Sequence, residues 1–180
     1  HSDHMGGNAA IVRRYGCPVV VPIGEAPLIE AWDERALWLD WAGQSADRFT
    51  AAGAIRPGER HVWGNLEWEA LAAPGHDMGA LCFLNAEHGV LISGDALWEH
   101  GFGVVMPPEI EPAALPSTRS TLDALAHLDV RTVIPGHGEP FLSWVASSRC
   151  RRGRVGRTVR VMPTARGTDR GRGRPSARRV

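Results

Sequence analysis

Histidine and aspartate side chains cluster at four places in the sequence, and at three of them they follow a glycine directly. They are His1, Asp3 and His4 at the start, then His76, Asp95 and His137 in Gly75-His76, Gly94-Asp95 and Gly136-His137-Gly138. Neutral imidazole and carboxylate groups together suit zinc, iron or manganese, and a carboxylate can bridge two cations. Because one ion needs only three or four such ligands, six of them predict a site for two metal ions.

Each of these residues on its own has an ordinary structural explanation. A single histidine after a loop glycine is usually a surface residue, and an aspartate after Ser-Gly usually belongs to a turn. The joint occurrence of the four clusters, the last three at the ends of apolar stretches, favours the metal site. The remaining histidines lack that context and are interpreted as surface or packing residues: His61, His88, His100 and His127.

The apolar stretches before these clusters predict β-strands that end at one edge of a sheet. Val90–Ser93 precedes Gly94-Asp95, and Arg131–Pro135 precedes Gly136-His137. Side chains at strand ends and in the loops that follow converge at one edge of an α/β sheet, where ligands normally bind. The other predicted strands are the runs 17–23 and 80–84 and a hairpin over 61–71 that turns at Gly64-Asn65.

Helices are expected between these strands. A short helix covers 9–14 after a polar loop, and a second begins with Ser117 or Thr118 as its cap, with Leu122, Leu125 and Leu128 on one face. Residues 24–57 predict a helical turn within loop, and their tryptophans are interpreted as packing residues rather than as the lining of a substrate entrance. Strands interleaved with helices indicate an α/β protein.

Taken in order, the four clusters resemble the signature of the metallo-β-lactamase superfamily. The segments are HSDHMGGN, APGHDMGAL, LISGDAL and VIPGHGEP, and the signature is HxHxDH, a PGH-type histidine, a Gly-Asp and a second PGH-type histidine. The resemblance covers about residues 1–141 and implies an αββα sandwich. It implies a first metal site with His1 and His76, a second with Asp3, His4 and His137, and Asp95 as the bridge between them.

The sequence departs from this signature at its start. The first histidine of HxHxDH would lie two residues before His1. The strands that precede this motif in the family are also absent from this sequence. We therefore expect an incomplete domain over residues 1–147 that lacks its N-terminal strands. Its first metal site would have two histidines plus the bridging Asp95.

The resemblance also implies a reaction. Two divalent ions lower the pKa of a shared water from about 15.7 to near neutrality, and Asp3 would be the catalytic residue that orients the hydroxide. Asp95 and the segments DHMGGN and GDALW are similar to the glyoxalase II-like and lactonase-like branches, whereas true β-lactamases usually have another residue in place of Asp95. We expect two zinc ions, with iron or manganese as alternatives, and a small ester, thioester or lactone as the substrate.

The last part of the chain has a different composition. Residues 149–180 contain 12 arginines and one acid, so the formal net charge of zero combines +11 in this segment with −11 in the rest. With few large apolar side chains, residues 148–180 are expected to be disordered. The favoured interpretation is out-of-frame translation of GC-rich DNA, and nucleic-acid binding or a solvated appendage without a role stay open.

Bulk composition limits the remaining possibilities. The 180 residues are 43% hydrophobic and suffice for one domain, and no run of eighteen apolar residues predicts a membrane span. Three scattered cysteines, Cys17, Cys82 and Cys150, predict a reducing, cytoplasmic setting. The expected partner is a small-molecule substrate rather than nucleic acid or a membrane. A nucleic-acid-processing member of the same fold and a non-catalytic remnant are the alternative functions.

Overall fold

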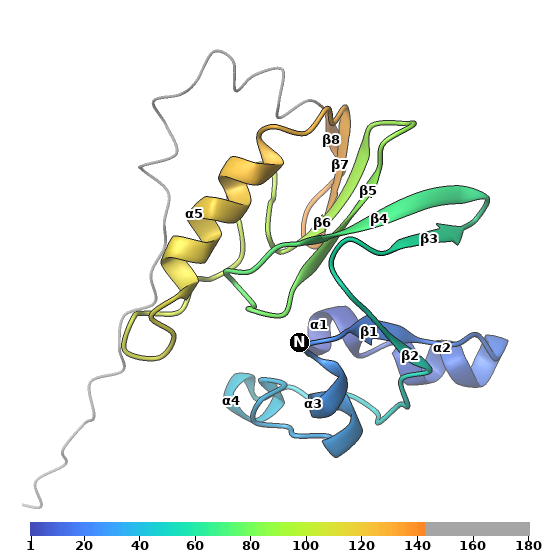
Figure 1. Cartoon of the computed structure of the whole chain (residues 1–180). Coiled ribbons are helices and arrows are strands. Elements are labelled where there is room, and N and C mark those ends of the chain that lie inside the picture. The colour runs from blue at the N-terminus through green and yellow to red at the C-terminus, as the bar shows by residue number, and fades with distance from the viewer. Residues whose placement is uncertain (143–180) are drawn as a thin grey trace, which may run out of the picture.

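The computed structural model describes residues 1–142, which form two β-sheets with helices beside them (Figure 1). Residues 143–147 of the predicted domain, Cys150 and the arginine-rich tail predicted over 148–180 lie outside the described residues. Helices and strands both occur along the described chain, with the strands β2 to β6 (residues 53–94) in succession and the helix α5 (114–125) between β6 and β7 (132–135), which confirms the predicted α/β class.

The larger sheet has six strands in the order β3-β4-β5-β6-β7-β8. Their bounds are β3 Arg60–Trp63, β4 Leu66–Ala72, β5 Leu81–Asn85, β6 Val90–Gly94, β7 Thr132–Pro135 and β8 Phe141–Leu142. Neighbouring strands are antiparallel except β6 and β7, which run parallel. The carboxyl ends of β6 and β7 therefore meet at one edge of the sheet. The residues that follow them include Asp95 and His137.

The chain before the larger sheet forms a separate group of elements, which we call the N-terminal layer (residues 1–55). It contains a parallel pair of strands, β1 Val20–Pro22 and β2 Gly53–Ile55, and the helices α1 Ser2–Met5, α2 Asn8–Tyr15, α3 Ala26–Ala31 and α4 Leu39–Ala42. Figure 1 shows this layer below the larger sheet. Its buried apolar side chains include Met5, Val21, Ile29 and Phe49, so α1 is packed into the layer through Met5.

The long helix α5, Ala114–Leu125, lies along the larger sheet (Figure 1). Leu91 of β6 and Val133 of β7 are partners in register and are each 1% exposed. They belong to one buried cluster with Leu122 and Leu125 of α5. Burial of such apolar surface contributes about 25 cal/mol per Å². It fixes the strands β6 and β7, and with them the loops that follow.

The predicted hairpin over residues 61–71 is confirmed. β3 and β4 pair with Trp63 opposite Leu66, which leaves Gly64 and Asn65 as the two turn residues. Both have positive φ, 59° for Gly64 and 64° for Asn65. A two-residue turn with positive φ at both positions matches the twist of antiparallel strands, and Asn and Gly adopt it at little cost.

The prediction that Ser117 or Thr118 caps the second helix is wrong. The helix α5 begins three residues before Ser117, at Ala114, and Thr118 is buried inside it. The hydroxyl of Thr118 donates a hydrogen bond to the carbonyl oxygen of Ala114, one turn earlier. A threonine in a helix interior can satisfy its hydroxyl in this way, which makes it resemble a cap in the sequence. Leu128 follows the end of the helix and still packs against the core.

Near the start of the chain the structure contains short helices and a strand that the sequence did not predict. The polar loop expected before residue 9 contains α1, and the stretch 24–57 contains α3, α4 and the strand β2. These elements are three to six residues long, and periodicity cannot identify elements so short. None of the helices in residues 1–142 is long and apolar enough to cross a membrane.

Candidate metal centre

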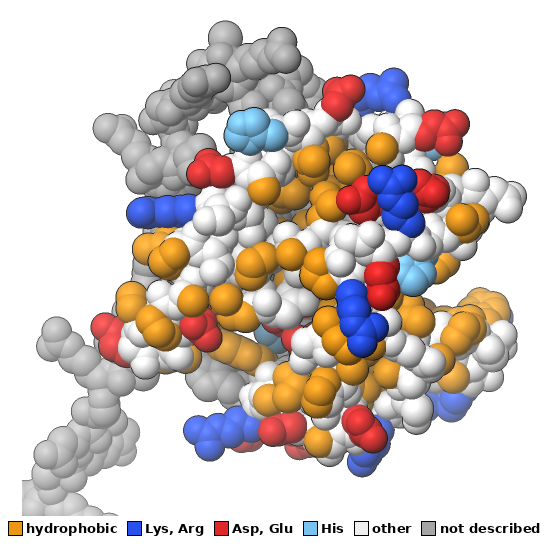
Figure 2. Space-filling view, viewed as in Figure 1, with side chains coloured by type: hydrophobic (Ala, Val, Ile, Leu, Met, Phe, Trp, Pro, Cys, Tyr) orange, Lys and Arg blue, Asp and Glu red, His pale blue; other side chains and the backbone are white. Residues whose placement is uncertain are grey.

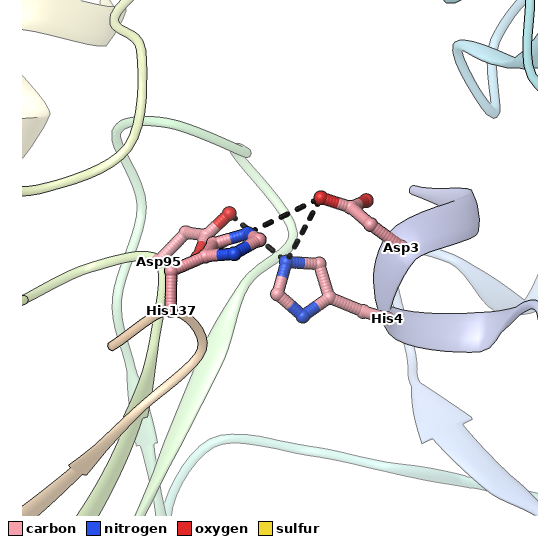
Figure 3. Close-up of side chains that lie close together, drawn as sticks. All are labelled: Asp3, His4, Asp95 and His137. Carbon is pink, nitrogen blue, oxygen red and sulfur yellow. Dashed lines mark hydrogen bonds and ion pairs between the residues drawn. The ribbon is translucent and has the colours of Figure 1, made fainter. Parts of the chain in front are cut away.

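All six residues singled out in the sequence lie around one point of the structure. His1, Asp3 and His4 come from the start of α1, His76 from the loop after β4, Asp95 from the end of β6, and His137 from the loop after β7. Figure 3 shows Asp3 and His4 on α1 facing Asp95 and His137 across a short gap. Ligand atoms from these four residues all lie within 4.8 Å of one another.

Two aspartates and two histidines make up the group drawn in Figure 3. His4 Nε2 lies 3.0 Å from Asp95 Oδ2 and 3.7 Å from Asp3 Oδ2. His137 Nε2 lies 3.2 Å from Asp3 Oδ2 and 3.7 Å from Asp95 Oδ1. Nitrogen and oxygen donors that converge in this way, without side chains between them, fit a first-row divalent cation.

His1 and His76 form a second group, and Asp95 joins it to the first. His76 Nε2 lies 3.2 Å from His1 Nδ1 and 3.4 Å from Asp95 Oδ2. On its other side His76 Nδ1 donates to the carbonyl oxygen of Val104 at 2.6 Å. Because that carbonyl can only accept, Nδ1 carries a hydrogen, and Nε2 is the ring nitrogen that faces His1 and Asp95. This is the arrangement of a histidine prepared to bind a metal.

The pKa shifts at the centre agree with a carboxylate of Asp95 that is shared between the two groups of histidines. Burial acts to raise the pKa of Asp95, but the hydrogen bond and charge of His4, the hydrogen bond from Trp98 and the charge of His76 together lower it. The hydrogen bond to Asp95 raises the pKa of His4 above 6.5, against the opposite effect of burial. Without a cation, His4 therefore holds a proton more strongly, and metal binding must displace that proton and weakens in acid.

Two glycines let the ligands approach one another. A methyl group on Gly136 would lie 2.5 Å from Asp95 Oδ1 and 2.7 Å from His4 Cε1. A methyl group on Gly103 would lie 2.6 Å from His76 Cγ. Sequence reasoning found Gly136 as part of a turn but missed Gly103, whose only signal is the repeated glycine in Gly101-Phe102-Gly103. Of the remaining histidines, His88 and His100 are exposed and His61 stacks on Trp63.

Trp98 is a further residue of the centre to which the sequence assigned no role. Its Nε1 donates a hydrogen bond of 3.0 Å to Asp95 Oδ1, and its ring makes an edge contact with His137 at 5.3 Å between centroids. The hydrogen bond holds one carboxylate oxygen of Asp95, and the other oxygen faces His4 and His76. Partners of metal ligands orient them and raise the affinity of the site.

Replacing Trp98 by phenylalanine is expected to weaken metal binding about tenfold, because the ring contact remains but the hydrogen bond to Asp95 is lost. Competition with a chromophoric zinc chelator measures the affinity. Trp63→Phe is the matched control, since Trp63 lies on β3 and stacks on His61, away from the centre. Equal affinities of the two variants would contradict a role for Trp98.

A pair of carboxyl groups lies beside the centre. Glu25 precedes α3, and Asp77 follows His76 and accepts a hydrogen bond from the backbone of Gly79. Burial, with the charge of Asp77 and a hydrogen bond to it, raises the pKa of Glu25 to about 7. A carboxyl group with a raised pKa favours the folded state while it is protonated and loses that contribution as pH rises through the folded pKa.

The variant Glu25→Gln is therefore expected to be more stable than the parent chain by about 1–2 kcal/mol at about pH 8. This figure is discounted from the full pKa difference because solvent screens the half-buried side chain. Near pH 4.5 the advantage should vanish, because the parent carboxyl is then protonated in the folded state. Urea denaturation at both pH values measures the difference. Glu30→Gln on the exposed side of α3 is the control for the loss of one carboxylate, and a constant advantage for Glu25→Gln would refute the raised pKa.

Known proteins match the chain over most of its described length. The sequence profile described as metallo-beta-lactamase superfamily matches residues 1–137. A hydroxyacylglutathione hydrolase of Chelativorans sp. (strain BNC1) is 27% identical over 134 residues, 74% of this chain and 43% of that protein. One of Pseudomonas putida (strain W619) is 29% identical over 139 residues, 74% of this chain and 42% of that protein. The chain spans about a third to two fifths of the length of these curated relatives.

Solved structures agree with the sequence match. The crystal structure of TTHA1623 in a di-iron-bound form has a TM-score of 0.64 and 25% identity, and the match covers 83% of this chain and 71% of that one. The BLEG-1 B3 metallo-beta-lactamase has a TM-score of 0.63 at 20% identity, with 82% and 70% covered. The profile match over residues 1–137 and these shared folds show that the chain belongs to the metallo-beta-lactamase superfamily.

Proposed function

We propose that the chain carries the metal centre of a hydrolase that acts on a small ester, thioester or lactone. The observation that carries this proposal is the convergence of four histidines and Asp3 around Asp95, from four separate parts of the sequence. The curated relatives support hydrolysis of a thioester in particular, since they are named hydroxyacylglutathione hydrolases.

The donor groups divide into two sets that share Asp95. His1, His76 and Asp95 would hold one ion, and Asp3, His4, His137 and Asp95 would hold the other. Imidazole and carboxylate ligands suit zinc, which we expect, and iron or manganese would also fit. When bound, such ions supply hydroxide at neutral pH and offset the negative charge that develops on the attacked carbonyl group.

Asp3 is the group placed to handle the proton and the orientation of the attacking water. Its carboxylate is 37% exposed, compared with 10% for Asp95, and it borders a cavity of about 290 Å³ together with His1, His76 and His137. A carboxylate at the wall of the cavity can accept a hydrogen bond from a water molecule there and aim its lone pair at a substrate. Asp95 is too enclosed between His4, His76 and Trp98 for this task.

Metal analysis and hydrolysis assays on the purified full chain test the proposal together. The chain is loaded with zinc, iron or manganese and assayed with a 4-nitrophenyl ester, an acyl thioester and a lactone. We expect between one and two ions per chain and metal-dependent turnover of at least one of these substrates. Less than one ion per chain together with no hydrolysis of any of them would refute the proposal and favour a non-catalytic member of the family.

A further inference from the structure

A second and larger cavity adjoins the metal centre. Its volume is about 490 Å³, and His1, His76 and Trp38 border both this cavity and the smaller one that contains Asp3 and Asp95. Figure 2 shows histidine and acidic atoms recessed between the N-terminal layer and the layer that holds α5, with apolar side chains around them. A group bound at the centre can therefore extend past His1 and His76 into the larger cavity.

Most of the wall of the larger cavity is apolar. Leu28 of α3 borders it, and so do Met106 and Ile110, which precede α5. Trp38 borders the passage to the metal centre, and its ring makes an edge contact with that of His1 at 5.5 Å between centroids. Ligand cavities are usually built in this way, with apolar walls and a few polar groups that set orientation.

The charged side chains at this wall are acidic. Glu25, Asp77 and Glu111 border the cavity, and within residues 1–142 no arginine does. Glu111 is engaged elsewhere, because its carboxylate accepts a hydrogen bond from the backbone of Ala113. Within residues 1–142 no arginine side chain forms an ion pair with Glu25 or Asp77.

Gly79 brings these two carboxylates to the wall. Its backbone donates to Asp77 Oδ1, and a methyl group in its place would collide with Glu25 Oε1. Because no side chain at position 79 separates them, both carboxylates lie at the same part of the cavity wall. A cation placed at this part of the wall would gain attraction from both carboxylates, and an anion would be repelled by both.

We propose that the larger cavity receives one end of the substrate, and that Glu25 and Asp77 select an apolar group that ends in a cation over one that ends in an anion. This inference rests on the proposed hydrolase function only in that the bound molecule is a substrate. Binding to the cavity itself can be measured without turnover. Glu25 and Asp77 are specificity-determining residues in this role, and no step of the reaction passes through them.

The test uses three probes of similar length that contain no ester: hexyltrimethylammonium, hexanol and hexanesulfonate. Their binding to the metal-loaded full chain is measured by ligand-detected NMR and calorimetry at about pH 8. We expect the cation to bind at least about tenfold more tightly than hexanol. We expect hexanesulfonate to bind more weakly than hexanol. This order should flatten as salt is added.

The variant Glu25→Gln should lose about tenfold in affinity for hexyltrimethylammonium while its affinity for hexanol stays within about twofold. Glu30→Gln on the same helix is the matched control, because it removes the same charge outside the cavity. Thermal denaturation confirms that both variants are folded. Equal binding of the three probes to the parent chain, or a cation preference that persists in the double variant Glu25→Gln with Asp77→Asn, would overturn the inference.

Esters with the same three ends connect this binding to turnover. If the proposed hydrolase function fails, none of the esters is cleaved while the order of probe binding persists. If the inference about the cavity fails, the esters are cleaved at similar rates and the probes bind alike. The two proposals therefore give different results and can be rejected separately.

Discussion

Replacing Asp95 by asparagine is expected to remove at least one metal ion per chain and to lower hydrolysis by about 10²–10⁴-fold. The reason is that the carboxylate of Asp95 faces both groups of histidines: Oδ2 lies 3.0 Å from His4 Nε2 and 3.4 Å from His76 Nε2, and Oδ1 lies 3.7 Å from His137 Nε2. An amide has the same shape but carries no charge, and its nitrogen would point a hydrogen at a cation or at an imidazole lone pair.

Metal content by plasma emission and turnover in metal-saturating buffer measure the two effects. Asp123→Asn serves as the control, because Asp123 is exposed on α5 and should leave both quantities unchanged. The change to asparagine should also remove the influence of Asp95 on His4, whose raised pKa depends first on that hydrogen bond. A variant at Asp95 that keeps two ions per chain would contradict the shared carboxylate and would require two independent sites.

The part of the centre that follows the strands could be predicted from the sequence. Val90–Gly94 and Thr132–Pro135 are short apolar runs, and a run that ends in glycine followed by Asp or His indicates where the chain leaves the sheet. The parallel pairing of β6 and β7 then requires Asp95 and His137 to be neighbours, because the ends of both strands lie at the same edge. Periodicity and residue type identify Asp95 and His137 as residues at strand ends, and the parallel pairing that makes them neighbours comes from the structure.

The parts that depend on short elements and on tertiary contacts could not be predicted. The helix α1 has only four residues, too few for its own helical propensity to stabilise it. The packing of Met5 in the core of the N-terminal layer helps to hold it in place. The hydrogen bonds from Trp98 to Asp95 and from His76 to Val104 join residues whose pairing no local pattern encodes. The cavity beside the centre has walls from α3, from the loop after β4 and from the segment before α5. Only the fold brings these three segments together.

Asp3→Asn is expected to separate catalysis from metal binding more clearly than any other change at the centre. Asp3 faces His137 Nε2 at 3.2 Å but lies 3.7 Å from His4 Nε2, and its side chain is 37% exposed at the cavity. An asparagine keeps one carbonyl oxygen for a cation and cannot accept a proton from water. We therefore expect kcat to fall about 10²-fold or more, with little change in KM.

The metal content of Asp3→Asn should stay within about half an ion of the parent chain, because His4, His137 and Asp95 remain as ligands of the same ion. Asp40→Asn on α4 is the matched control, since it removes one exposed carboxylate from the same layer without touching the centre. If Asp3→Asn loses metal in proportion to kcat, Asp3 is a ligand and nothing more. If it keeps the metal and loses turnover, the carboxylate handles the proton of the attacking water. Its side chain is 37% exposed, compared with 10% for Asp95, and this greater access to water favours that second result.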